Sequence, residues 1–186
     1  MKLFQAFHEY SHNWAAVTTA HWQKYPNEKT PHVVHVEVIN RDLDPQTGVL
    51  RTERLIMCRQ PCPAIVARIL GVGDTNYVLE YSEIDPNNNV LKAVSTNLTL
   101  HDLLNVREEI VYRPNPDNLS RTLFDQSAAI TAFGMISRVS SYIEDFSVKR
   151  FKDNAQSGKK AFEQVLERIV QSANNSNTLP TTAQAT

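Results

Sequence analysis

Apolar and polar residues alternate along most of the chain before residue 134. In residues 32–43, for example, Val34, Val36 and Val38 alternate with His35 and Glu37. A period of two is typical of a β-strand that buries one face, and turn sequences rich in Pro, Asn, Asp and Gly separate the alternating segments. The pattern predicts seven strands, at residues 2–10, 32–43, 49–59, 76–84, 90–99, 104–112 and 119–133. Since most successive strands are joined as hairpins, we expect one antiparallel sheet.

The period changes to 3.6 after residue 134 and keeps that value to about residue 170. Apolar residues then recur every three or four positions, which is typical of a helix with one buried face; they are Ile136, Val139, Ile143, Phe146, Phe162, Val165 and Ile169. A helix over 134–170 would be about 55 Å long. A short helix is expected over 14–24, with Ser11 or Asn13 as its N-cap. The predicted fold is α+β, with a curved seven-stranded antiparallel sheet gripping the long C-terminal helix.

The apolar stripe of the long helix is interrupted in its middle by Arg150, Asn154 and Gly158. These positions are predicted to face the sheet, and a buried charge needs a partner. An anionic ligand group is one candidate partner for Arg150, and an acidic residue of the sheet is the other. The neighbouring lysines also fit a solvated basic face; they are Lys149, Lys152, Lys159 and Lys160.

Residues 61–73 form an apolar segment that is bounded by prolines and glycines and is too irregular for another strand. A loop this apolar is not expected to lie bare on the surface. Either it packs on the core, or it covers an apolar site as a lid. In the second case Ile65, Val66, Ile69 and Leu70 would form the cover.

Composition fits a single globular domain, expected over residues 1–170, followed by a disordered tail at 171–186. Hydrophobic residues make up 41% of the chain and charged residues 21%, and the net charge of −1 gives no indication of nucleic-acid binding. No segment approaches the roughly 20 apolar residues of a membrane-spanning helix. The N-terminal residues lack the features of a cleaved leader, so any organelle would have to be reached without one.

One catalytic motif occurs, His8-Glu9-x-x-His12, which matches the H-E-x-x-H of zinc metallopeptidases. That motif binds zinc only on a helix, whereas these residues end a predicted strand, where the two histidines would lie roughly 13 Å apart. A zinc metallopeptidase is therefore kept only as an alternative; we predict no enzyme, no metal site and no cofactor. Cys58 and Cys62 lack a second pair to complete a metal site, and are either free thiols or a local disulfide.

Several segments, spread from residue 1 to about residue 170, carry a resemblance to a known family. They are residues 1–5 (MKLFQ), 22–28 (WQKYPNE), 32–33 (HV), 52–56 (TERLI), 97–99 (NLT), 131–134 (TAFG) and 144–151 (EDFSVKRF). In sequence and spacing they resemble the PRELI-like family, and within it the slowmo branch.

The resemblance implies a phospholipid transfer protein of the mitochondrial intermembrane space, in which sheet and helix enclose the lipid and an apolar loop forms the lid. It also implies a heterodimer with a small twin Cx9C helical-hairpin protein. The slowmo branch carries phosphatidylserine between the outer and inner mitochondrial membranes. The PRELI branch carries phosphatidic acid for cardiolipin synthesis, which is the alternative expectation here.

Carried over position by position, the resemblance places the head group near Lys24, His32, Arg54, Arg150 and Asn154, and the lid between Cys62 and about Val72. Two positions depart from the family, because Cys58 and Ser157 stand where relatives often have Lys. A phosphate site with fewer lysines is expected to be weaker or rearranged, so the preferred head group stays open. The basic exterior of the long helix would also favour docking on anionic membranes.

The energetics of lipid transport set a requirement on such a protein. A two-chain phospholipid has roughly 30 CH2 groups, each worth about 0.8 kcal/mol in a bilayer, so that desorption costs on the order of 20 kcal/mol. A surface patch does not replace that environment, whereas a deep apolar cavity with a cover does. We therefore expect an enclosed lipid; a scaffold that uses the same fold without lipid is the remaining alternative.

Overall fold

The computed structural model describes residues 1–61, 67–68, 71, 73–133 and 137–177. Its elements are β1 (Lys2–Tyr10), α1 (Trp14–Gln23), β2 (Val33–Leu43), β3 (Leu50–Arg59), β4 (Thr75–Asp85), β5 (Val90–Asn97), β6 (Leu104–Asn115), β7 (Asn118–Ala132) and α3 (Ser137–Asn177). The predicted strands, the short N-terminal helix and the long C-terminal helix are thus confirmed. The predicted lid positions Cys62, Ile65, Val66, Ile69 and Leu70 lie outside the described residues.

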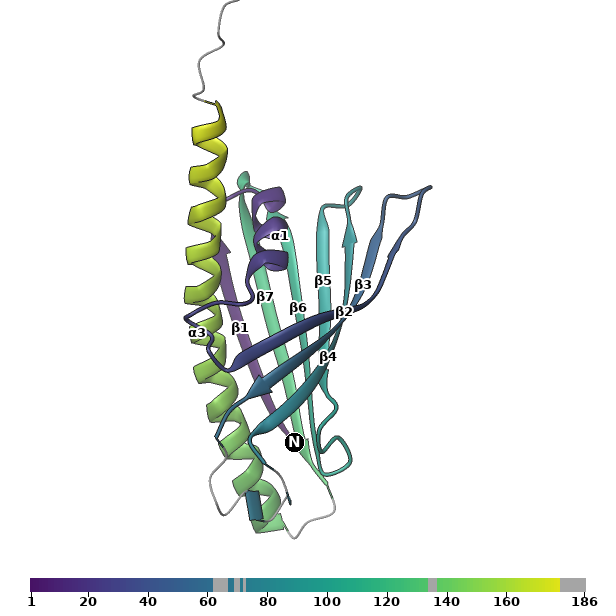
Figure 1. Ribbon diagram of the computed structural model, residues 1–186, viewed down its shortest axis with the longest axis vertical. Coiled ribbons are helices and arrows are strands. Elements are labelled where there is room, and N and C mark those ends of the chain that lie inside the picture. Colours follow the sequence, from purple (N-terminus) through teal and green to yellow (C-terminus); the bar gives the residue numbers. More distant parts are fainter. Residues whose placement is uncertain (62–66, 69–70, 72, 134–136, 178–186) are drawn as a thin grey trace, which may run out of the picture.

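The sheet has the strand order β1-β7-β6-β5-β4-β3-β2, and every neighbouring pair is antiparallel. The first strand pairs with the last, so β1 and β2 form opposite edges although they are consecutive strands of the chain. Figure 1 shows the sheet bending from β1, beside α3, round to β2, whose first residues return to the same helix. Just before β2, Asn27 Nδ2 donates a hydrogen bond to the Ala161 carbonyl of α3 at 3.3 Å. The edge strand β1 and the segment that leads into β2 therefore both reach α3.

Helix α1 begins where the sequence predicted. The Oδ1 atom of Asn13 accepts a hydrogen bond from the backbone N–H of Ala16 at 2.9 Å, which makes Asn13 the N-cap. Val17 and Ala20 are fully buried against α3 and the sheet. They share one core cluster with Tyr10, Leu91, Ala93, Ile110, Tyr112, Phe162, Val165 and Leu166.

Helix α3 spans 41 residues, about 62 Å at the usual rise. It continues to Asn177, past the predicted end at residue 170, because neither glycine nor proline occurs between Gly158 and Pro180 to stop it. Its C-terminal half packs in the large core cluster, and near its start Ile143 is fully buried in a second, smaller one. Between the two clusters, Arg150, Asn154 and Gly158 are only half-buried. No described helix is apolar enough over sufficient length to cross a membrane.

Candidate functional site

A cavity of about 650 Å³ lies between the sheet and the middle of α3, within the range of about 300–1,000 Å³ typical of small-molecule sites. Its walls are mainly apolar and come from both layers; they include Phe4, Val33, Ile56, Val78, Leu104, Val106, Ile110, Phe124, Phe146, Phe151 and Phe162. The polar interruption of the α3 stripe falls on this cavity, because Arg150, Asn154 and Gly158 all line it. The two core clusters hold the helix on either side of this cavity.

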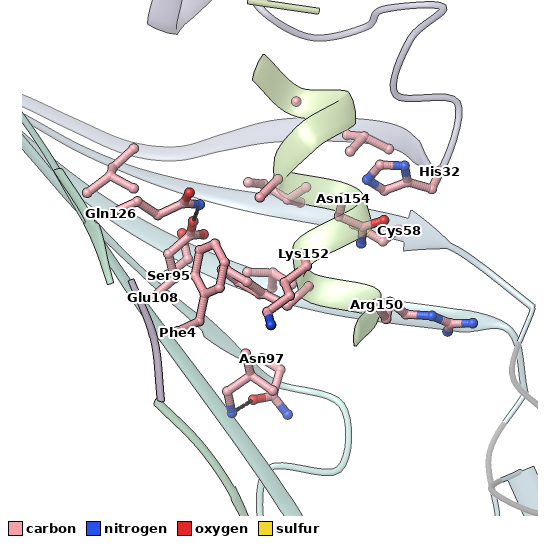
Figure 2. A pocket seen from close by; sticks show the side chains of 18 of the residues that line it. Phe4, His32, Cys58, Ser95, Asn97, Glu108, Gln126, Arg150, Lys152 and Asn154 are labelled. Atoms are coloured by element: carbon pink, nitrogen blue, oxygen red, sulfur yellow. Dashed lines mark hydrogen bonds between the residues drawn. The ribbon is translucent and has the colours of Figure 1, made fainter. Parts of the chain in front are cut away.

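Of the five predicted head-group residues, Lys24, His32, Arg150 and Asn154 line the cavity. They reach it from the end of α1, the residue before β2, and α3. Figure 2 shows His32, Arg150 and Asn154 on one side of the cavity, opposite Glu108 and Gln126. Arg54 is not among the described lining residues and lies behind the wall.

Arg150 supplies a positive charge on the His32 side of the cavity. The Arg150 guanidinium donates a hydrogen bond to the Pro61 carbonyl and lies over the Phe146 ring, 4.6 Å from its centroid. Burial, with Arg150 adding to the effect, lowers the pKa of His32, so its imidazole is neutral at neutral pH. Asn154 and Gln60 exchange two amide hydrogen bonds, of 2.8 and 3.2 Å. This side therefore offers a guanidinium, a neutral imidazole and two amides.

Arg54 forms a buried ion pair with Glu80 across β3 and β4. Its Nε and Nη2 atoms lie 2.9 and 2.5 Å from the same carboxylate oxygen, and its guanidinium lies 4.8 Å from the Trp22 ring centroid. Burial disfavours the Glu80 carboxylate, but His21, Lys24 and Arg54 outweigh this effect and hold its pKa below the usual range. The charge of Arg54 is thus matched by a residue of the sheet.

His21 completes the group behind the cavity wall. It is fully buried, and burial, reinforced by the Lys24 charge, lowers its pKa to about 4. Its neutral Nε2 lies 3.3 Å from Arg54 Nη2, which donates to it. This imidazole therefore adds no charge to the site at neutral pH.

Lys24 is another cation that lines the cavity. It caps the C-terminus of α1, and its Nζ lies 5.0 Å from the Tyr25 ring centroid. Burial lowers its pKa, with Arg54 adding to the effect, while Glu80 and Glu108 favour the charged form. Among the described carboxylates, none forms an ion pair with Lys24 within 4.0 Å. Its charge is therefore available to a ligand.

The sequence analysis missed most of the polar residues that line the cavity, among them Glu80, Glu108 and Gln126, and it placed Lys152 and Lys159, which also line the cavity, on the exterior. Gln126 Nε2 donates a hydrogen bond to Glu108 Oε1 at 2.5 Å, drawn as a dashed line in Figure 2. The signal was present in the strand alternation, since Glu108 shares a face with the buried residues Ile110 and Tyr112. An acidic residue on the strand face that otherwise carries buried apolar residues therefore indicates a polar position inside the cavity.

The zinc-binding motif and Cys58 are the remaining candidate features of the sequence. His8 lies in β1 and His12 follows the end of that strand, so the H-E-x-x-H motif is not helical. No group of three or more metal-ligating side chains occurs in the described part of the chain. Cys58 is a free thiol that lines the cavity, and burial raises its pKa to about 11. At neutral pH this thiol is uncharged, so it adds no positive charge to the cavity.

Known proteins share the sequence and the architecture of this chain. The model of the PRELI-like family matches residues 15–173. "Protein UPS2, mitochondrial" of Saccharomyces cerevisiae is 44% identical over 168 residues, which cover 90% of this chain and 73% of that protein. "Protein slowmo homolog" of Dictyostelium discoideum is 33% identical over 177 residues, which cover 95% of this chain and 76% of that protein.

Solved structures at low sequence identity share the fold. The Zhui aromatase/cyclase from Streptomyces superposes with a TM-score of 0.64 at 11% identity, covering 92% of this chain and 97% of that chain. A START superfamily protein from Mycobacterium smegmatis superposes with a TM-score of 0.51 at 12% identity, covering 88% and 98%. The architecture is thus common to distant proteins, whereas the sequence match is specific, and the chain belongs to the PRELI-like family.

Proposed function

We propose that this protein is a mitochondrial lipid carrier that moves phosphatidylserine between the outer and inner membranes across the intermembrane space. The cavity between sheet and helix is the observation that carries the proposal, because it offers apolar walls to acyl chains and cations to a phosphate. The mitochondrial relative at 44% identity supports the compartment. The resemblance to the slowmo branch supports phosphatidylserine, and transfer of phosphatidic acid is the second candidate.

The head group would be held by Lys24, His32, Arg150 and Asn154. An arginine gives directed, charge-assisted hydrogen bonds to phosphate oxygens, and Lys24 contributes a second positive charge. Arg54 would act from behind the wall by holding Glu80 in place. The reaction requires no bond to be made or broken, so the protein is proposed to be a carrier and not an enzyme.

Membrane docking is proposed for the outer face of α3. Lys149 and Lys160 are exposed on this helix, whereas Lys152 and Lys159, which the sequence analysis also placed on the exterior, line the cavity. Each lysine near an anionic membrane surface contributes about 1 kcal/mol of attraction. The part of the cavity beside Arg150 would then face the membrane from which the lipid enters.

A small twin Cx9C helical-hairpin protein is proposed as the partner of this chain. Apolar side chains stand exposed on the edge strand β2, where Ile39 and Leu43 are 54% and 60% exposed. An exposed apolar edge strand is a liability unless another element covers it. A helical partner lying over β2 would cover these side chains.

Transfer of fluorescent phospholipids between liposomes tests the proposed function. We expect the full chain, purified with its partner, to move phosphatidylserine, and we expect Lys24→Glu and Arg150→Glu each to reduce the rate at least about tenfold. Arg107→Glu is the matched control, since Arg107 is an exposed arginine paired with Glu109 at 3.6 Å. Unchanged transfer by both cavity variants would refute the head-group assignment. Absence of transfer by the unmodified chain would refute the function itself.

A further inference from the structure

We propose that Glu108, held by Gln126, recognises the ammonium group of the lipid head group, so that the cavity prefers phospholipids with a primary ammonium over those without one. This inference rests on the proposed lipid transfer and specifies the class of lipid. The observation behind it is an acidic side chain inside a cavity that the head group of an anionic lipid would enter.

The position of Glu108 is fixed by the strand register. It lies in β6, opposite Ala128 of β7, and its side chain is half-buried in the cavity wall. Its neighbour Glu109 points to the other face, where it pairs with Lys92 at 3.0 Å and Arg107 at 3.6 Å. Two adjacent glutamates of one strand therefore have opposite surroundings, one paired with two cations and the other directed at the ligand space.

Glu108 lacks a cationic partner among the described residues. The hydrogen bond that it receives there comes from the neutral amide of Gln126, and none of the described ion pairs includes it. The other inward-facing carboxylate, Glu80, is instead matched by Arg54 at 2.5 Å. A carboxylate in an apolar cavity is costly without a cation. A ligand ammonium would supply the missing charge.

The charges around Glu108 also fit a head group with separated charges. Lys24 and Glu108 both line the cavity and influence each other's ionisation without forming a contact ion pair. Burial raises the pKa of Glu108, with Glu80 adding to the effect, while Gln126 and Lys24 oppose it. A phosphate at Lys24 and an ammonium at Glu108 would satisfy both groups. A phosphate monoester, with up to two negative charges, would instead leave the Glu108 carboxylate without a cation.

Competition between phosphatidylserine and phosphatidylglycerol in a liposome transfer assay tests the proposal. Both lipids carry a single net negative charge at pH 7, and only phosphatidylserine has the ammonium group. We expect the full chain to prefer phosphatidylserine. Glu108→Gln should reduce that preference about tenfold or more, because it removes a charge-assisted hydrogen bond to the ammonium group. Glu108→Asp should retain most of the preference. Glu109→Gln, the same change on the opposite face, should leave it unchanged.

The outcomes distinguish this inference from the proposed function. If the full chain transfers neither lipid, both the function and the inference are overturned. If it transfers lipids but shows equal rates for the two, or if Glu108→Gln retains the preference, the inference alone is overturned. Should Glu108→Gln fail to fold, the unmodified chain still decides, because it must transfer phosphatidylserine faster than phosphatidylglycerol.

Discussion

The Arg54→Met substitution removes the cation that faces Glu80, and we expect it to destabilise the protein by about 3–5 kcal/mol, the cost of leaving a buried charge without its partner. The two side chains are 4% and 3% exposed and approach to 2.5 Å. His21 lies 3.7 Å from the same carboxylate, but its pKa of about 4 leaves it neutral at pH 7. It therefore does not replace the lost charge.

Urea unfolding and thermal denaturation at pH 7 measure this effect. For a domain of this size, 3–5 kcal/mol corresponds to a fall in Tm of roughly 6–20 °C. Arg51→Met is the matched control on the same two strands, since Arg51 and Glu83 form a pair at 2.9 Å that is 40% and 42% exposed. An exposed pair contributes at most about 1 kcal/mol. The double variant Arg54→Met/Glu80→Leu should regain most of the lost stability, because it leaves no unpaired buried charge.

One result would refute the reasoning about Arg54. If Arg54→Met were as stable as the unmodified chain yet no longer transferred lipid, Arg54 would act on the ligand and not through Glu80. If Arg54→Met instead loses stability, and the double variant restores both stability and transfer, then Arg54 supports the wall of the cavity.

Three further substitutions test other parts of the structure. Gly158→Ala should raise the unfolding free energy by up to about 1 kcal/mol in urea denaturation, because a Cβ there has no heavy atom within 4 Å and alanine favours the helix; a loss of stability would contradict this. Asn13→Ala should lower it by about 1 kcal/mol through loss of the α1 cap, and an unchanged midpoint would contradict the capping role. Stability should fall as pH drops from about 6.5 towards 4, because His21 binds its proton more readily in the unfolded chain, with its folded pKa near 4. His21→Gln should flatten that part of a pH series of unfolding curves, and an unaltered profile would assign the dependence to other groups.

The periodicity of the sequence was sufficient for the fold, because each strand and helix carries its own local signal. The ends of elements were less predictable. Strand β6 continues to Asn115, past the predicted end at residue 112, because a shift of register at Pro114 and Asn115 accommodates the proline that breaks the alternation. Helix α3 likewise continues past its predicted end, because neither glycine nor proline occurs between Gly158 and Pro180.

The site was predictable only in part. Arg150 and Asn154 stood out because they interrupt an apolar stripe, whereas Lys24 and His32 were found through the family resemblance. The pairing of Arg54 with Glu80 depends on strand register across 26 residues of sequence, which no local pattern encodes. Glu108 was overlooked although its alternation with Ile110 and Tyr112 assigns it to the inner face.

The central claim is that the cavity between sheet and α3 holds a phospholipid, and native mass spectrometry with lipid extraction tests it most directly. The full chain and Gly158→Ala, incubated with mixed liposomes and repurified, should carry bound phospholipid. Gly158→Trp, which places a large side chain in the cavity that Gly158 lines, should keep its circular dichroism spectrum and carry none. An unmodified chain without lipid, or equal lipid on the chain with Gly158→Trp, would contradict the claim.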